Sequence, residues 1–307
     1  MKIIKSDNGF PYAWKAGRVE QLIRDILERK AQEQLAVGSV MLINSTWLLD
    51  RDLAKEIHDA APDFIICHDL VDPAIPRVKK IIQDSGVPHL CIGNSNQCRL
   101  DFWAMVCDLN FQAYTNDELT LNPSAKKFMC LNRKPHAHRR VIMQYLDQVK
   151  DQGYLTSTAS YDLVDPDVAG YSIPNDVYTL GDISTWQGAY LNIVTETTFN
   201  NDDFFISEKT WKPVIGLRPF FVYGQPKLRQ YLKDQGFDTF EDIIDYASLA
   251  GETEHDYAEL AVKTINNLIV NCSPRFQQRL VNNQQRFRSY VYEQWNRLLN
   301  LNLANYV

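Results

Sequence analysis

Residues 204–224 place an acid–base pair, Glu208 and Lys209, between two apolar runs in the segment FFISEKTWKPVIGLRPFFVYG. Ser207 is a residue type that caps helix N-termini, so we expect a helix to begin at Glu208. The first turn of a helix has unpaired N–H groups and a positive dipole end, which together favour a phosphate. Lys209 would add a full positive charge, and the Glu208 carboxylate would accept hydrogen bonds from ribose hydroxyls. The pattern therefore predicts a cradle for a nucleoside diphosphate.

The same dipeptide has a second interpretation that needs no ligand. Glu208 would cap its own helix and pair with a lysine at the protein surface. No phosphate loop of the GxxxxGK[ST] type occurs in the chain. Pro213 cannot donate a hydrogen bond within a helix, so the predicted helix is short or kinked. The run RPFFVYG, residues 218–224, then predicts a buried strand.

A basic cluster and an acidic strand end are two further candidate pieces. The segment CLNRKPHAHRR, residues 130–140, follows a predicted strand and opens a predicted helix. Its basic side chains are Arg133, Lys134, His136, His138, Arg139 and Arg140. Such a density of donors at a helix start suits an anion, although it also suits a solvated basic turn. Glu196 lies just past an apolar strand in NIVTETTF, where an acid marks either a site or a cap.

The first third of the chain has the rhythm of a parallel α/β sheet. Apolar runs predict strands at 39–46, 63–69 and 88–94, and periodicity predicts helices at 18–33, 53–61 and 74–86. In such sheets, ligands gather beyond the carboxyl ends of the strands. The residues at these ends are Asn44, Ser45, Thr46, His68, Asp69, Gly93, Asn94 and Ser95.

A second α/β unit follows a polar stretch at 116–127, which is typical of a linker. The elements predicted after it are strands at 128–132, 189–197 and 218–224, and helices at 138–152, 226–237, 238–245 and most of 256–303. A length of 307 residues is natural for two domains. We therefore expect an α/β fold with Rossmann-like domains at 1–120 and 121–275. C-terminal helices at 276–307 would pack back on the first domain.

The overall composition narrows the class of protein. Hydrophobic residues make up 45% and charged residues 23%, as in ordinary soluble proteins. No apolar run approaches the roughly 20 residues of a membrane span, and the N-terminus lacks a signal peptide, so we expect a cytoplasmic protein. The net charge of −6 does not favour a long DNA contact. The six cysteines form no CxxC pair and no zinc pattern, which predicts buried, reduced thiols.

Three motifs in a fixed order carry a resemblance to a known family. FMCLNRKPHAHRR, then LNIVTETTF, then FFISEKTWKP…RPFFVYG resemble the C-terminal half of the α1,3/4-fucosyltransferases. They look even more like bacteriophage and bacterial glycosyltransferase-like proteins, and the match covers residues 128–245. The resemblance implies a GT-B architecture, in which two Rossmann-like domains face each other across a cleft. It implies an inverting transfer without a metal or other cofactor, from a nucleoside-diphosphate sugar, with a GDP-sugar favoured, to a hydroxyl of a glycan or modified nucleobase.

The resemblance also implies residue roles in nucleotide-sugar binding. Glu208 would take the ribose, and Lys209 with Arg139 or Arg140 would take the diphosphate. Glu196 would lie near the sugar or its ribose. The remaining residues of the implied nucleotide-sugar site are Asn132, Arg133 and Ser207.

The N-terminal half departs from the family pattern at the general base. The family has a Glu-Ser-Pro turn there, whereas this chain has Asn94 and Asn96 at the Glu and Pro positions. An amide cannot accept a proton at neutral pH. The base would then be another group at a neighbouring strand end, and the candidates are Asp69, Asp72 and His68.

Other functions stay open on the sequence alone. Asn94 motivates a nucleotide-sugar-binding protein that has lost catalysis. The aromatic residues of the helical C-terminus motivate an oligomeric scaffold, although ordinary packing also accounts for them. Asp165–Pro166–Asp167 is a DxD candidate for a metal, and its context favours a structural turn.

Overall fold

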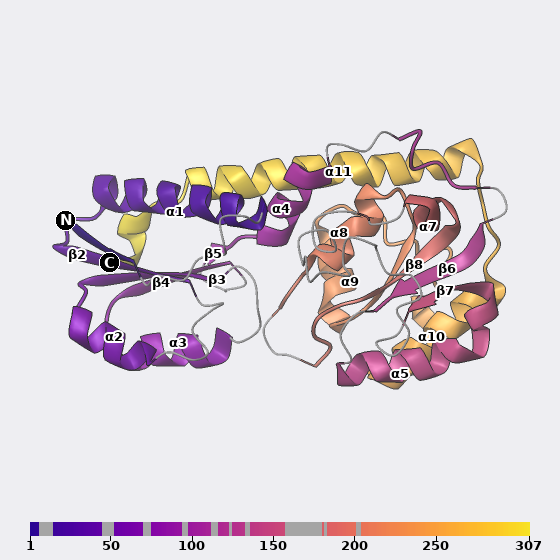
Figure 1. Cartoon of the computed structure of the whole chain (residues 1–307), viewed down its shortest axis with the longest axis horizontal. Helices are drawn as coiled ribbons and strands as arrows, with labels where there is room; N and C mark the ends of the chain where they lie inside the picture. Colours follow the sequence, from indigo (N-terminus) through magenta and orange to yellow (C-terminus); the bar gives the residue numbers. More distant parts are fainter. Residues whose placement is uncertain are drawn as a thin grey trace. The chain divides into compact units, whose positions relative to one another are not determined.

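The computed structural model shows a mixed α/β chain with two parallel β-sheets (Figure 1). The residues that it describes are 1–5, 15–44, 52–69, 75–93, 98–111, 116–122, 125–132, 136–156, 180, 183–200 and 204–307. The chain divides into two compact units. The first unit is Met1–Val106 together with Val291–Val307, and the second is Cys107–Tyr290.

The described strands of the first unit form a sheet of order β1-β2-β3-β4-β5, in which neighbouring strands are parallel. They are β1 (Lys2–Lys5), β2 (Ser39–Asn44), β3 (Phe64–Asp69), β4 (His89–Gly93) and β5 (Cys98–Arg99). The three strands predicted in this region are confirmed as β2, β3 and β4. The strands β1 and β5 have only 4 and 2 residues, too few to show a clear pattern in sequence.

Helices cover both faces of this sheet (Figure 1). α1 (Lys15–Gln34) lies on one face, and α2 (Leu53–Ala60) and α3 (Ile75–Asp84) lie on the other. On the second face Ile43 of β2 and Cys67 of β3 pack in one core with helix residues such as Ile57. Because side chains alternate along a strand, His68 faces the opposite side, which α1 covers.

The described strands of the second unit form a parallel sheet of order β7-β6-β8-β9. They are β6 (Lys126–Leu131), β7 (Gly153–Thr156), β8 (Ala189–Thr195) and β9 (Phe220–Tyr223). Every residue of β8 and β9 is buried, as expected for a parallel sheet that is covered on both faces. The predicted strands at 128–132, 189–197 and 218–224 are confirmed as β6, β8 and β9.

Helices alternate with the strands of the second unit. α5 follows β6, α8 precedes β9, α9 follows it, and α10 packs against α5. The helical elements beyond the first three are α4 (Phe102–Phe111), α5 (Ala137–Leu146), η2 (Asp147–Gln152), α7 (Ile183–Gln187), α8 (Glu208–Ile215), α9 (Pro226–Asp234), η4 (Tyr246–Ser248), α10 (Glu254–Asn267), α11 (Pro274–Leu299) and η5 (Leu303–Tyr306). Among the described helices, none is both long and apolar enough to cross a membrane.

The long helix α11 contributes to both units, because the division falls after Tyr290. In the second unit the Tyr290 ring lies 5.2 Å from that of Trp211, measured between centroids. In the first unit Gln294 Oε1 accepts a hydrogen bond from the Asp101 N–H at 3.1 Å. The segment predicted at 276–307 is thus divided between the units, and its residues from Val291 onward belong to the first.

Two segments differ from the sequence prediction. Residues 238–245 form turns rather than a helix, because Phe240 has a left-handed φ of 57° and the Asp238 carboxylate accepts its N–H at 2.9 Å. The polar stretch at 116–127 is not a free linker. Leu119 is buried there, and its carbonyl accepts a hydrogen bond from Arg218 at 2.9 Å. The division between units accordingly falls at 106/107 rather than at 120/121.

Candidate functional site

The carboxyl edge of the second sheet holds most of the described candidate residues. Parallel strands end at the same edge of a sheet, so residues that follow β6 and β8 lie close to one another. Asn132 follows β6, and Glu196 follows β8. The first turns of α5 and α8 carry the other candidates of this unit. The hydrogen bonds at this edge decide which of these side chains can serve a ligand.

Glu196 is the centre of this edge and is only 1% exposed. Its carboxylate accepts hydrogen bonds from Ser207 N at 3.2 Å, Ser207 Oγ at 2.6 Å, Thr210 Oγ1 at 2.5 Å and Thr197 N at 3.1 Å. Gly224 makes room for it, since a Cβ on that glycine would lie 2.8 Å from the Glu196 Cβ. A carboxylate has about four acceptor positions, and all are used here. The expected contact of Glu196 with a sugar or ribose is therefore replaced by a structural role: it ties α8 to the end of β8.

Ser207 caps α8 as predicted, because its Oγ accepts the Lys209 N–H at 3.3 Å. The Lys209 ammonium lies 2.7 Å from Glu208 Oε1 and 3.3 Å from Ser207 Oγ. The Glu208 and Lys209 side chains are 10% and 30% exposed, respectively. The acid–base pair of the second sequence interpretation is thus present. Both partners still reach solvent at the start of a helix, where an anion is favoured.

The first turn of α5 is fastened to the same strand end. His138 Nε2 lies 2.8 Å from the Glu196 carbonyl, and Arg139 donates to the carbonyls of Thr195 and Glu196, each at 3.1 Å. Because a carbonyl oxygen can only accept, Nε2 carries the proton in this contact. Burial is the main reason that the pKa of His138 lies below its usual value. Arg139 is 3% exposed, so its expected place on a diphosphate is corrected to a role within the protein.

Asn132 is also used internally, and it is only 4% exposed. Its Oδ1 accepts a hydrogen bond from the Thr195 hydroxyl. Its Nδ2 contacts Cys130 Sγ at 3.3 Å and Met143 Sδ at 3.1 Å. The implied role of Asn132 in ligand binding is therefore not supported by this geometry, which instead joins β6, β8 and α5.

Arg140 differs from the other candidates on α5. It is exposed, and its guanidinium makes no hydrogen bond or ion pair with a residue that the structure describes. Among the candidate cations of this edge that the structure describes, Arg140 and Lys209 are therefore the ones that an anion can approach. They lie in the first turns of the two helices that Glu196 and its carbonyl hold to β8.

Among the catalytic candidates of the first unit, His68 is the one whose side chain the structure describes. His68 is fully buried, and burial, followed by the charge of Arg24, lowers its pKa to about 3. A buried imidazole cannot reach an acceptor hydroxyl, so His68 does not fit the role of general base. The Asp69 side chain and the residues Asp72, Asn94, Arg133 and Asp165–Asp167 lie outside what the structure describes. Within its described ranges, no group of three or more His, Cys, Asp or Glu is placed to hold a metal.

Comparisons of the chain with models of protein families, with curated proteins and with solved structures found no match. The resemblance to glycosyltransferases therefore depends on the three sequence motifs. The geometry of the carboxyl edge is independent of that resemblance.

Sequence reasoning missed three hydroxyl side chains that bind Glu196, Asn132 and the His138 carbonyl. Thr210 and Thr195 supply hydroxyls, and the Tyr223 hydroxyl donates to the His138 carbonyl at 3.0 Å. A usable signal was the clustering of hydroxyl residues at the ends of two apolar strands and in the turn after Ser207. Small hydroxyls next to a lone buried acid are the partners that its oxygens require.

Proposed function

We propose that the protein is a glycosyltransferase that moves a sugar from a nucleoside-diphosphate sugar to a hydroxyl acceptor. One observation carries the proposal on the structural side. The N-termini of α5 and α8 are both fastened to the end of β8, and each presents an accessible cation, Arg140 and Lys209. Two helix N-termini and two cations at the carboxyl edge of a parallel sheet suit a diphosphate.

In this proposal Lys209 exchanges its contact with Glu208 for the diphosphate. A partly exposed ion pair contributes little to stability, on the order of 1 kcal/mol, so opening this pair costs little free energy. Glu208 is then free to accept hydrogen bonds from ribose hydroxyls. Arg140 binds the other phosphate of the same diphosphate. Arg139 and Glu196 keep the N-termini of α5 and α8 in place. The rigid scaffold is thus separate from the groups that would touch the nucleotide.

Glycosyl transfer from such a donor needs two kinds of help. Charge that develops on the departing nucleoside diphosphate would be stabilised by Lys209, Arg140 and the main-chain N–H groups, without a metal. The acceptor hydroxyl would lose its proton to a base on the first unit, for which Asp69 stays the candidate at the end of β3. We extend the proposal to a GT-B arrangement, an inverting outcome and a GDP-sugar donor.

Isothermal titration calorimetry with a panel of GDP- and UDP-sugars tests the proposal. We expect Lys209→Ala to weaken donor binding by about a hundredfold, because a charge-assisted contact to phosphate contributes about 3 kcal/mol. Lys263→Ala is the matched control, since Lys263 also pairs with a carboxylate, Asp245, at 3.1 Å on the second unit. Equal donor binding by the parent and Lys209→Ala would overturn the assignment.

A second candidate function is nucleotide-sugar binding without catalysis, and Asn94 at the expected base position favours it. Slow cleavage of the donor by water separates the two functions, because a transferase activates the same bond towards water. Release of nucleoside diphosphate above the rate of Lys209→Ala supports the transferase. Tight donor binding with no release favours the binding protein.

A further inference from the structure

The second unit contains a partly open cavity of about 160 Å³ at the edge of its sheet opposite to Glu196. This cavity, the inner pocket, lies where β8 and β9 begin, because Tyr190 and Pro219 line it. Its apolar wall comes from Leu119, Leu121, Leu217, Phe276, Leu280 and Val281. The volume is large enough for a molecule of the size of benzene.

A buried positive charge lies beside the inner pocket. Arg218 is only 2% exposed, and it lines the cavity. Its guanidinium donates to the carbonyls of Ala189 at 2.9 Å, Leu119 at 2.9 Å and Leu217 at 2.8 Å, as well as to those of Trp186 and Gly216. It forms no ion pair with a residue that the structure describes. Carbonyl dipoles therefore balance its charge, and no described carboxylate pairs with it.

The inner pocket also has a buried hydroxyl group, that of Tyr190, which could donate a hydrogen bond to a ligand. Tyr190 lines the inner pocket, is 1% exposed, and stacks on Phe276 with ring centroids 5.5 Å apart. Its hydroxyl lies near the main chain of Asn271 but makes no hydrogen bond of good geometry within the described part of the chain. Burial raises the pKa of Tyr190, so the hydroxyl stays protonated and can donate. A buried donor without an acceptor costs about 1–3 kcal/mol, which a ligand oxygen would recover.

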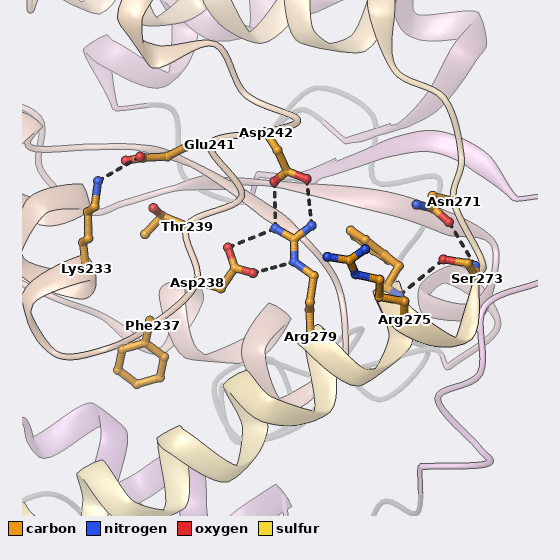
Figure 2. Close-up of a pocket in the computed structure, with 11 residues that line it drawn as sticks. Lys233, Phe237, Asp238, Thr239, Glu241, Asp242, Asn271, Ser273, Arg275 and Arg279 are labelled. Carbon is orange, nitrogen blue, oxygen red and sulfur yellow. Dashed lines mark hydrogen bonds and ion pairs between the residues drawn. The ribbon is translucent and has the colours of Figure 1, made fainter.

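In the polar pocket next to this cavity, the charged side chains pair with one another. This outer pocket, of about 630 Å³, shares Asn271 and Phe276 with the inner pocket. Figure 2 shows Arg279 between two carboxylates there, with Nε at 2.7 Å from Asp238 Oδ2 and NH1 at 2.7 Å from Asp242 Oδ2. Lys233 pairs with Glu241 at 2.8 Å (Figure 2). Because these groups satisfy one another, the outer pocket does not specify a ligand.

We propose that the inner pocket binds a small apolar monocarboxylate, such as an aromatic acid of the size of benzoate. The apolar body fills the space between the leucine side chains and Phe276. One carboxylate oxygen accepts the hydrogen bond from Tyr190, and the negative charge balances that of Arg218. Asp117 also lines the pocket, but it is exposed, so solvent screens its repulsion. This site is independent of the proposed nucleotide-sugar site.

Cys272 offers a direct readout of occupancy. It lines the inner pocket and is partly exposed, whereas the other five cysteines are buried. Alkylation of the native protein by iodoacetamide should therefore occur first at Cys272, which intact mass spectrometry can follow. Cys272→Ser verifies this assignment, because it should abolish the fast-reacting thiol.

The probes are benzoate, its neutral isostere benzamide, and inorganic phosphate. We expect benzoate to slow the alkylation of Cys272 at concentrations at least about tenfold lower than benzamide, because only benzoate carries the charge. Phosphate should give no protection, since it lacks an apolar body. Equal protection by benzoate and benzamide would overturn the acidic specificity, and no protection by benzoate would overturn the site.

Two variants keep the proposal falsifiable without disrupting the fold. Tyr190→Phe keeps the ring stacking but removes the donor, so the benzoate affinity should fall about tenfold. Val281→Phe places a larger side chain on a partly exposed helix position of the pocket wall and should remove protection altogether. Unchanged benzoate affinity in both variants would show that benzoate binds elsewhere.

Discussion

The two ends of strand β8 each carry a buried charge, and the two charges are stabilised in opposite ways. At the carboxyl end the Glu196 carboxylate accepts hydrogen bonds from hydroxyls and N–H groups. At the amino end the Arg218 guanidinium donates to carbonyls, including that of Ala189 in the strand itself. Neither group forms an ion pair with a described residue. Fully hydrogen-bonded buried charges of this kind orient the segments around them at the cost of desolvation.

The two ends of β8 differ in the groups that could contact a ligand. At the carboxyl end two cations stay accessible to solvent: Lys209, in a partly exposed ion pair with Glu208, and the exposed Arg140. At the amino end the group is a buried hydroxyl, that of Tyr190, beside a cavity. The first end therefore suits a large polyanion that approaches from solvent. The second suits a small molecule that enters an apolar space.

Replacement of the buried guanidinium should have the largest effect on stability. Arg218→Met removes every donor from the surrounding carbonyls, and we expect a loss of about 5 kcal/mol or more, enough to unfold much of the protein. Urea denaturation followed by circular dichroism measures this loss. Arg275→Met, at an exposed position on α11, is the control and should change stability by less than about 0.5 kcal/mol. A loss below about 1 kcal/mol for Arg218→Met would show that the carbonyls do not depend on it.

Replacement of the buried carboxylate should have a smaller effect. Glu196→Gln keeps the shape and one acceptor oxygen but turns an N–H₂ group towards two donors, so we expect a loss of about 2–3 kcal/mol. The same urea titration applies, and the exposed Glu252→Gln is the control. If Glu196→Gln destabilises the protein more than Arg218→Met, the ranking of the two ends of β8 is wrong.

The buried His68 of the first unit should make the free energy of unfolding depend on pH. The pKa of His68 falls from 6.5 to about 3 on folding, so the unfolded chain binds the proton more readily. Its contribution to stability is complete above pH 6.5 and is lost as the pH falls, by about 2 kcal/mol between pH 7 and pH 5. The free energy of unfolding at these two pH values tests this, and His68→Leu should remove that part of the slope. An unchanged slope in His68→Leu would assign it to other groups.

A matched pair of buried tyrosines gives the smallest and most direct contrast. Tyr223→Phe removes a hydrogen bond to the His138 carbonyl and should cost about 1 kcal/mol. Tyr190→Phe removes a hydroxyl that has no partner among the described residues and should leave stability unchanged or slightly raised. Thermal unfolding of both variants without ligand measures the difference. Equal losses in the two variants would mean that the Tyr190 hydroxyl has an acceptor.

Local pattern was sufficient for the elements with strong periodicity. The buried strands β2, β3, β4, β6, β8 and β9 were predictable because each consists mostly of apolar residues. The Ser207 cap was predictable because it is a local hydrogen bond. Residues 238–245 were not predictable in this way, because the left-handed Phe240 breaks a pattern that otherwise looks helical.

The sequence by itself determined an alternating α/β chain, the start of α8, and the presence of unusual charges at Glu196, Glu208 and Lys209. Only the tertiary structure decided what each charge does. Glu196 is bound by Thr210, 14 residues away, and Arg218 by the carbonyl of Leu119, 99 residues away. A buried charge takes its donors or acceptors from whichever segments the fold brings to it, and local sequence does not encode that choice.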